Sequence, residues 1–283
     1  KAPPFWIRSI LILTCTSVSY AHGSNDGQKG VGLIMLILIG FAPMHFAVDR
    51  AKKPENLYQQ SRQIEWNLGH IDTNRLDPVA RTAVTVALEN LNQIESSTKN
   101  IRSFDELNKT EHSELRNSII LAGKSTETIL KSLRKNPQLQ ISKLRISVLS
   151  SKLAELKANT EYSPRWVILL VSLSLGLGTM VGWKRIVVTI GEKIGKTHLT
   201  YAQGASAELV AASTIGVSTM FGLPVSTTHV LSSGIAGTMV AGEGRHNLRM
   251  GTVRSILIAW IITLPVTILL SGGMFFVLRH ILN

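Results

Sequence analysis

Polar and ionisable residues crowd together between Tyr20 and Gly32, and an apolar run flanks them on each side, over residues 9–21 and 31–48. An ionisable group at membrane depth costs at least ~2.5 kcal/mol, so such a group usually marks a path for an ion or a substrate. Discontinuous membrane helices can direct backbone N–H groups at an anion where the freed backbone lines protein or a water-filled cavity. We therefore predict one long membrane helix broken in its middle, or a tight helical hairpin, with a polar site at the break. The alternative is a polar loop between two spans.

A second polar stretch lies inside the uncharged residues 209–242, a segment too long for one ordinary membrane span of about 20 residues. We expect a break at Phe221-Gly-Leu-Pro224, which leaves Val225-Ser-Thr-Thr-His229 at the start of the next helix. Proline suits the first helical position, and the hydroxyl groups that follow would surround the positive end of the helix. This pattern predicts a cradle for an oxyanion. Alternatively, the hydroxyl groups bond their own backbone or a neighbouring helix.

The same side chains also allow an enzymatic and a metal-binding interpretation. Ser226, His229 and Asp26 could serve an intramembrane hydrolase, and His22 could join Asp26 and His229 around a metal ion. No GxSxG, HExxH or paired-cysteine pattern accompanies them, although such chemistry commonly carries one of those patterns. We therefore predict that the chain is not an enzyme and that it holds no resident metal or other cofactor.

The composition and its distribution indicate a membrane protein with a soluble insert. The 283 residues are 45% hydrophobic and carry a formal charge of +12. Apolar runs fill residues 9–48 and 166–283, whereas residues 49–160 are charged throughout. Most of the 30 Lys and Arg either lie among acids in the insert or flank the apolar runs, as expected for membrane orientation. The lipid bilayer is therefore a predicted partner, and nucleic acid is not. The single Cys15 excludes a disulfide framework within the chain.

The sequence divides into three predicted regions. Residues 1–48 form the membrane segment or segments with the broken helix, residues 49–163 form a soluble three-helix insert, and residues 164–283 form further membrane segments with the second motif. Residues 166–183 and 255–278 are each about long enough to cross a bilayer.

Helix start signals divide the insert. Asp77-Pro78 provides an N-cap acid and a proline at the first helical position, Ser103-Phe-Asp-Glu106 matches a capping box, and Asn136-Pro137 opens a third helix. Spacings of three and four predict one buried stripe on each helix. The stripes are Ala80, Val84, Ala87, Leu91 and Ile94; Leu115, Ile119, Ala122, Ile129 and Leu133; and Leu144, Val148, Leu153 and Leu156. Three such helices predict an antiparallel bundle.

Two further motifs, Gly191-Glu-Lys-Ile-Gly195 and Thr200-Tyr-Ala-Gln-Gly204, complete a family resemblance. With them and the two polar stretches, the chain resembles the second half of the Pit family of inorganic phosphate transporters, and it is most similar to the enterobacterial low-affinity type. The resemblance covers residues 1–48 and 164–283, and the insert resembles the variable region of the family.

This resemblance implies a fold and a function. The fold would be an all-α polytopic membrane protein, one half of an inverted repeat with discontinuous or re-entrant helices. The function would be secondary active symport of inorganic phosphate, free or as a metal-phosphate, with H⁺ as the coupling cation and Na⁺ as the alternative. The location would be the bacterial cytoplasmic (inner) membrane. The implied partners are phosphate, the other repeat of the same protein upstream, and a second copy in a homodimer.

The resemblance also implies roles for individual residues. The expected substrate-binding residues are Ser24, Asn25, Gln28, Ser226, Thr227 and Thr228, with Asp26 for the coupling ion and His22, Lys29, Gln203 and His229 in support. Gln28 and Lys29 stand where many members have alanine and asparagine, which puts sodium coupling in doubt and favours protons. An unpaired, ionised Asp26 would repel phosphate, so its neutralisation would permit binding. Lys29 either pairs with Asp26 or attracts phosphate, and spacing alone leaves both open.

A membrane sensor is the alternative function, because a helical bundle bracketed by membrane spans resembles the outer domain of a bacterial receptor. Several apolar segments with internal polar breaks exceed what a sensor requires.

Overall fold

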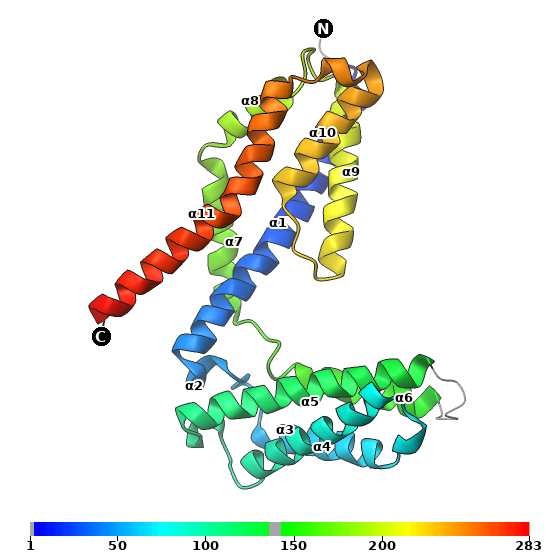
Figure 1. Cartoon of the computed structure of the whole chain (residues 1–283), viewed down its shortest axis with the longest axis vertical. Coiled ribbons are helices and arrows are strands. Elements are labelled where there is room, and N and C mark those ends of the chain that lie inside the picture. The colour runs from blue at the N-terminus through cyan, green and yellow to red at the C-terminus, as the bar shows by residue number, and fades with distance from the viewer. Residues whose placement is uncertain (1–2, 136–142, 283) are drawn as a thin grey trace. The chain divides into compact units, whose positions relative to one another are not determined.

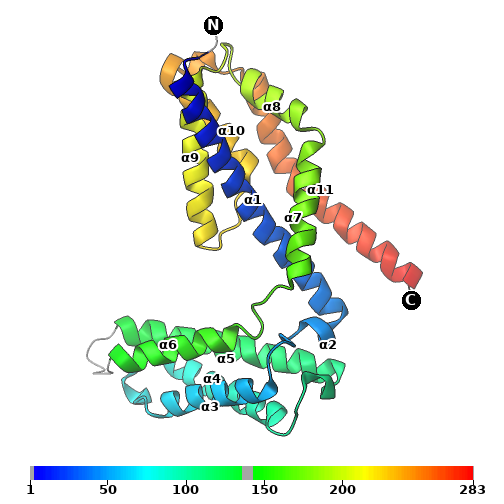
Figure 2. The same cartoon turned by 180° about the vertical axis from the view of Figure 1, so that it is seen from behind.

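The computed structural model describes residues 3–135 and 143–282, and the described residues form helices and connecting loops without a β-strand. The expected all-α class is therefore confirmed for this part of the chain. The chain divides into two compact units, one of residues 1–30 with 169–283 and the other of residues 31–168. The helices of both units are labelled in Figure 1, and Figure 2 gives the reverse view.

The first unit is built from long apolar helices. It contains the first part of α1 (Phe5–Phe41) and most of α7 (Arg165–Met180), followed by α8 (Trp183–Glu192), α9 (Tyr201–Met220), α10 (Thr227–Glu243) and α11 (Met250–Leu282). Helices α9 and α10 form a hairpin and pack along their length (Figures 1 and 2). Their small residues allow this close approach, since Ala207 is fully buried beside Gly234.

Helix α11 leaves its apolar side chains uncovered by the rest of its unit. Within the described residues, one helix is long and apolar enough to cross a bilayer, namely Met250–Val277 of α11, with a mean hydropathy of 2.2. Pro265 lies inside α11 without ending it. Helix α7 is apolar but ends at Met180, so the uncharged stretch expected to run to Trp183 divides between α7 and α8.

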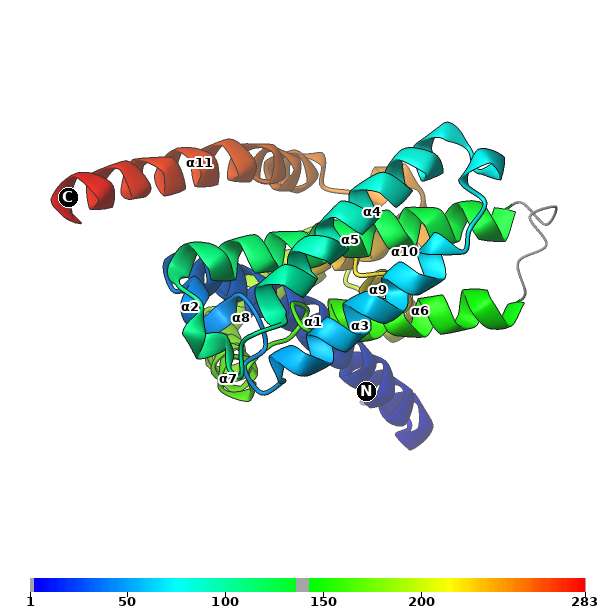
Figure 3. The same ribbon diagram turned by 90° about the horizontal axis from the view of Figure 1, so that it is seen from below.

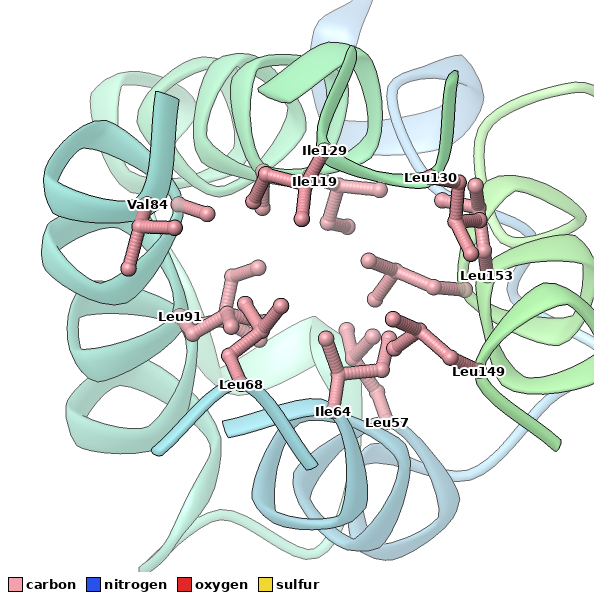
Figure 4. Packing of buried hydrophobic residues seen from close by; sticks show 14 of the residues in the cluster. Leu57, Ile64, Leu68, Val84, Leu91, Ile119, Ile129, Leu130, Leu149 and Leu153 are labelled. Carbon is pink, nitrogen blue, oxygen red and sulfur yellow. The ribbon is translucent and has the colours of Figure 1, made fainter. Parts of the chain in front are cut away.

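The second unit contains a four-helix bundle, which Figure 3 shows from below with its helices lying lengthwise in the view. Its helices are α3 (Pro54–Gly69), α4 (Pro78–Thr98), α5 (Lys109–Lys135) and α6 (Lys143–Lys157), and the short α2 (Pro43–Phe46) precedes them. Each helix packs against the next in the chain, and α6 closes the bundle against α3. The prediction of three helices is corrected, because α3 contributes the fully buried Leu57 and Ile64 to the common core (Figure 4).

The capping signals of the bundle are confirmed in part. Asp77 caps α4, because its side chain accepts a hydrogen bond from the Ala80 amide. The capping box at Ser103 exists, but it caps a 3-10 turn over Phe104–Glu106. The long helix α5 begins later, where Asn108 accepts from the Thr110 amide. The predicted start at Asn136-Pro137 lies outside the described residues.

The buried stripes follow the predicted spacing on α4 and α5 and depart from it on α6. All ten predicted stripe residues of α4 and α5 are buried. On α6, Leu153 and Leu156 are buried as predicted, but Leu144 and Val148 are exposed and Leu149 is buried instead. The core-facing side of α6 is therefore rotated, because packing against α3 and α5 selects Leu149 over its equally apolar neighbours.

Candidate functional site

The polar stretch of α1 forms an ion cluster on one side of the helix. Asp26 accepts two hydrogen bonds, one from Lys29 Nζ to Oδ1 at 2.7 Å and one shared with His22 Nε2 at Oδ2 over 2.8 Å. The spacings of three and four residues bring these side chains together on a continuous helix. Both oxygens of the carboxylate are therefore engaged within the cluster.

The first apolar segment contains no break, which corrects the prediction of a broken helix or a hairpin there. Helix α1 runs from Phe5 to Phe41 without interruption, so neither a break nor a hairpin occurs between Tyr20 and Gly32. A glycine costs a helix about 1 kcal/mol relative to alanine, whereas a backbone group left unpaired in lipid costs several. The glycines of the stretch therefore weaken α1 without ending it.

The second predicted break is present, between α9 and α10. We call residues 221–226 the α9–α10 turn. Gly222 has a positive φ of 67°, which reverses the chain after α9. The side chain of Ser226 caps α10 by accepting a hydrogen bond from the His229 amide. Pro224 lies two residues before this cap, which corrects its expected place at the first helical position.

Asn25 joins the two polar stretches. Its carboxamide Nδ2 donates to Thr219 Oγ1 at 2.9 Å and to the Leu223 carbonyl at 3.3 Å. Its Oδ1 accepts a hydrogen bond from the Val225 amide at 3.4 Å. Asn25 is 2% exposed, so its carboxamide is withdrawn from water and depends on these partners for its hydrogen bonds. Asn25 therefore fixes the α9–α10 turn through partners that lie about two hundred residues later in the sequence.

Lys29 makes the second link between the two stretches. Its Nζ donates to the Val225 carbonyl at 2.7 Å as well as to Asp26. Lys29 therefore makes the pair with Asp26 that was one of its two expected roles. The ammonium group bridges the carboxylate of α1 and the backbone of the α9–α10 turn.

Two neighbouring cavities lie beside the cluster. One, of about 620 Å³, is lined by His22, Thr227 and Thr228 together with apolar side chains of α7 and α8. The other, of about 680 Å³, is lined by His22, Ser24 and hydroxyl-bearing residues of α1 and α7. His22 faces both cavities, so it stands between the residues at the start of α10 and Ser24.

The remaining predicted site residues lie elsewhere. Gln28 is exposed on α1. Gln203 caps the start of α9 through Thr200, and this position lies ~24 Å along the helix from Thr219. The ring of His229 packs on Trp260 with centroids 3.9 Å apart. The pairs needed for a hydrolase or for a metal site at His229 are therefore not formed among these side chains.

Sequence reasoning missed an acid in the same helix pair. Thr14 of α1 donates a hydrogen bond to Glu208 Oε2 of α9 at 2.5 Å. The Thr14–Glu208 and Asn25–Thr219 pairs share the same offset of 194 residues. They lie eleven residues apart, about three turns or ~16 Å, so they mark one contact face between two parallel helices. The available signal was an acid at the edge of the uncharged residues 209–242.

These features describe a helical protein whose polar side chains meet at a turn between apolar helices. The comparison with known families agrees, because the model of the phosphate transporter family matches residues 1–271. The chain belongs to this family. Membership implies a location in a membrane.

Individual relatives point the same way. The chain is 39% identical to the low-affinity inorganic phosphate transporter PitA of Escherichia coli K12, over 97% of this chain and 58% of that protein. It is 39% identical to PitB of the same organism, over 98% of this chain and 58% of PitB. It is 40% identical to the low-affinity inorganic phosphate transporter of Buchnera aphidicola subsp. Acyrthosiphon pisum, over 98% of this chain and 58% of that relative.

The chain therefore spans somewhat more than half the length of the curated relatives it matches. These relatives are named as transporters, which agrees with the prediction that the chain is not an enzyme. No solved structure matches the chain.

Proposed function

We propose that this chain is part of a secondary active transporter, a symporter that carries inorganic phosphate across the bacterial cytoplasmic membrane with a proton as the coupling cation. The observation that supports this proposal most directly is the meeting of the two polar stretches through Asn25 and Lys29. The family and the named relatives support phosphate as the substrate.

The start of α10 supplies suitable donors for an oxyanion. The first amides of a helix lack partners within the helix and carry its positive end, so the amides of Thr227 and Thr228 can face an anion. Both residues also line the 620 Å³ cavity with their side chains. Ser226 uses its oxygen as an acceptor for the cap, which leaves its hydroxyl proton available for donation.

The ion cluster removes the repulsion that a bare carboxylate would exert on phosphate. Asp26 is paired with Lys29 and with His22, so its negative charge is balanced at the edge of the proposed site. A coupling proton taken up by Asp26 would weaken its hold on Lys29, which also bonds the α9–α10 turn. Proton binding and the shape of the turn would thereby be linked.

We infer a multi-pass arrangement in which lipid covers the exposed apolar helices, and α11 is the helix that supports this most strongly. Elements equivalent to the uncovered part of the relatives would complete the site as the other repeat, and a homodimer is a candidate assembly. No resident cofactor is proposed, since phosphate, the coupling cation and any divalent metal travelling with phosphate are transported species.

The test is uptake of radiolabelled phosphate into vesicles that carry the full-length protein, with proton, sodium and divalent-metal gradients imposed separately. We expect a proton gradient to drive uptake. Thr227→Ala should raise the KM for phosphate about tenfold, because one good hydrogen bond to a charged group contributes roughly 1.5 kcal/mol.

Thr263→Ala is the matched control, because Thr263 is exposed on α11 and its hydroxyl donates to the Ala259 carbonyl of its own helix. If Thr227→Ala and Asp26→Asn both took up phosphate like the parent at equal membrane abundance, the site would be wrongly assigned.

A further inference from the structure

The charges of the helical bundle are distributed unevenly over its helices. The second half of α5, residues 124–135, carries four Lys or Arg and one Glu, and α6 has the same numbers of each. Each of these two segments therefore has a net charge of +3. Helices α3 and α4 each carry two Glu and one Arg, a net charge of −1. The positive charge of the bundle is thus concentrated in α5 and α6.

The structure brings several of these cations to one surface. Lys124, Lys131 and Lys135 follow one another at intervals of seven and four residues, so they lie on the same side of α5. All three are exposed, whereas Ile129 and Leu133 of the same helix are buried. Helix α6 packs beside α5, and Figure 4 shows Leu130 of α5 next to Leu153 of α6.

Two further cations lie at the contact between α5 and α6. Arg134 of α5 is exposed, and its Nη2 donates to Ser150 Oγ of α6 at 3.0 Å. Lys157 of α6 has its Nζ 3.8 Å from Glu127 Oε2 of α5. We call the following five residues the basic face: Lys124, Lys131, Arg134, Lys135 and Lys157.

The acids nearby balance only part of this charge. Glu127 is shared between Lys131, at 3.6 Å, and Lys157, at 3.8 Å. Glu161 lies 3.2 Å from the same Lys157 Nζ. Among the residues that the structure describes, Lys124 and Lys135 have no acidic partner within ion-pair distance. The basic face therefore keeps an excess of positive charge that is open to an anionic partner.

The arrangement suits an extended anionic surface better than a single small anion. The groove between α5 and α6, of about 390 Å³, is lined by Glu127 and Glu161 as well as by Arg134 and Lys157. Two carboxylates in the groove disfavour an anion bound inside it. The three lysines of α5 are instead spread over eleven residues, which is ~16 Å along the helix. Charges at that spacing can each meet a different anionic group.

The lipid bilayer is the anionic surface that is always within reach of the bundle. The chain connects the bundle at one end to α1 and at the other to α7, both of them apolar. Such a connection gives headgroups a high effective concentration around the bundle. Basic clusters next to membrane segments are attracted to anionic lipids within a Debye length of the membrane surface.

We propose that the basic face docks on the anionic lipid headgroups of the membrane that holds the apolar helices. Docking would fix which side of the bundle faces the bilayer. The proposal rests on the membrane location of the family and does not depend on the proposed transport of phosphate.

The binding test uses a segment of residues 43–162, which contains every buried residue of the bundle core, from Ala47 to Leu156. The Asp49–Asn159 hydrogen bond closes its two ends. Sedimentation with vesicles measures binding, with phosphatidylcholine alone compared with about three parts phosphatidylcholine to one part phosphatidylglycerol. The segment should bind the anionic vesicles at least about tenfold more tightly, and added salt should weaken this binding.

Matched charge variants test the basic face itself. Gln at Lys124, Lys131 and Lys135 together should lower binding to the anionic vesicles by at least about tenfold, because each Lys near an anionic surface contributes to binding. Arg at the same three positions should restore it. The control places Gln at three exposed cations away from α6, namely Lys99, Arg102 and Lys109, and should bind like the parent. The two Gln variants have the same net charge, so a difference between them reports the position of the charge.

The orientation of the bundle is tested in the full-length protein, reconstituted in the same anionic lipid. A fluorophore is attached to Thr128→Cys on α5 or to Thr85→Cys on α4, in a Cys15→Ser background because the native thiol is exposed. Lipids with a nitroxide on the headgroup quench fluorophores that lie close to them. The α5 label should be quenched severalfold more than the α4 label, and Gln at the three lysines should reduce this difference.

The outcomes distinguish this inference from the proposed function. Selective binding to anionic vesicles that the Gln variant loses supports the inference, even if the full-length parent takes up no phosphate. Equal binding to both kinds of vesicle, or equal loss in the two Gln variants, overturns it, even if the parent transports phosphate well. Release of the segment from vesicles by inorganic phosphate, at an ionic strength held constant with chloride, would assign the basic face to the free anion and overturn docking on lipid.

Discussion

At the scale of single residues, Asn25 differs in its contacts from the hydroxyl-bearing residues with which the family resemblance grouped it. Its buried carboxamide is committed at both ends to Thr219, Leu223 and Val225. Thr227 and Thr228 instead line a cavity. We therefore propose that Asn25 is a positioning residue that holds the turn before α10, with the threonines as the candidates for contact with the substrate.

Asn25→Ala should lower stability and uptake together. The substitution removes the side-chain partner of the Leu223 carbonyl and of the Val225 amide, and each lost hydrogen bond costs roughly 0.5–1.5 kcal/mol. We expect a lower apparent unfolding temperature and a reduced maximal uptake with little change in KM. Thr227→Ala should show the reverse pattern, a raised KM at unchanged unfolding temperature. A raised KM in Asn25→Ala at parental stability would assign Asn25 to the substrate instead.

At the scale of elements, the α9–α10 turn depends on one backbone conformation. Gly222 has a φ of 67°, in the region that side chains disfavour, although a Cβ there would meet no described atom within 4 Å. The need for glycine is thus conformational and not steric.

Gly222→Ala should destabilise the full-length protein by about 1 kcal/mol, because a left-handed residue with a side chain costs about that much. Gly216→Ala is the matched control, since Gly216 lies within α9 and also has no described atom within 4 Å of a built Cβ. The control should be neutral or slightly stabilising, because alanine favours a helix interior. Thermal unfolding in detergent measures both, and equal effects would contradict the conformational explanation.

In the insert, a contact between α3 and α4 brings two acids together. Burial, followed by the nearby charge of Glu65, raises the pKa of Glu95 to about 7. Arg62 opposes this rise, with its Nη1 3.7 Å from Glu95 Oε2. The Glu95 side chain is only 13% exposed, so its ionised form is poorly solvated.

The raised pKa of Glu95 predicts a bundle that becomes less stable as pH rises. The folded state binds more protons than the unfolded state between the ordinary pKa of 4.5 and about 7, so stability falls across that window and stays low above it. The loss should be on the order of 2 kcal/mol. Glu95→Gln should remove this dependence, and Glu89→Gln, at an exposed position of α4, should keep it.

Urea unfolding of an isolated segment 43–162 at pH 5 and pH 8 provides the measurement, with Trp66 as the single tryptophan of that segment. A parent segment that is equally stable at both pH values would contradict the shifted pKa of Glu95.

At the scale of the whole molecule, the first and last residues of the insert lie side by side. The Asp49 amide donates to the Asn159 carbonyl at 2.8 Å. Arg116 Nη1 donates to the carbonyls of Ala47 at 2.7 Å and of Thr160 at 3.2 Å. Burial lowers the pKa of the Arg116 guanidinium, which remains charged, and these carbonyls satisfy it. The bundle thus has its own core and closed ends, as a domain inserted into another chain does.

Excision of residues 49–159 should therefore leave phosphate uptake within about twofold of the parent when a short Gly-Ser link joins Val48 to Thr160. The ends already lie within hydrogen-bond distance, so a short link can span them. Uptake per molecule at the membrane is the measurement. Normal abundance with lost uptake would show that the bundle takes part in transport.

The sequence predicted most of the elements and their local signals. The buried stripes of α4 and α5, the Asp77 cap and the end of α9 near Gly222 follow from spacing and residue type. The fourth helix α3, the rotated face of α6 and the late start of α5 were missed. At each of these places the local sequence is compatible with more than one helix start or buried face. Packing against the neighbouring helices decides which one forms.

The sequence by itself determined that two polar stretches lie within apolar helices and that one of them surrounds a helix start. Only the tertiary structure decided that α1 continues through its glycines and that Asp26 is paired with Lys29. It also decided that Asn25 and Lys29 bond the α9–α10 turn. The physical reason is that local composition sets the cost of ending a helix. Partners almost two hundred residues away determine where its polar side chains form their bonds.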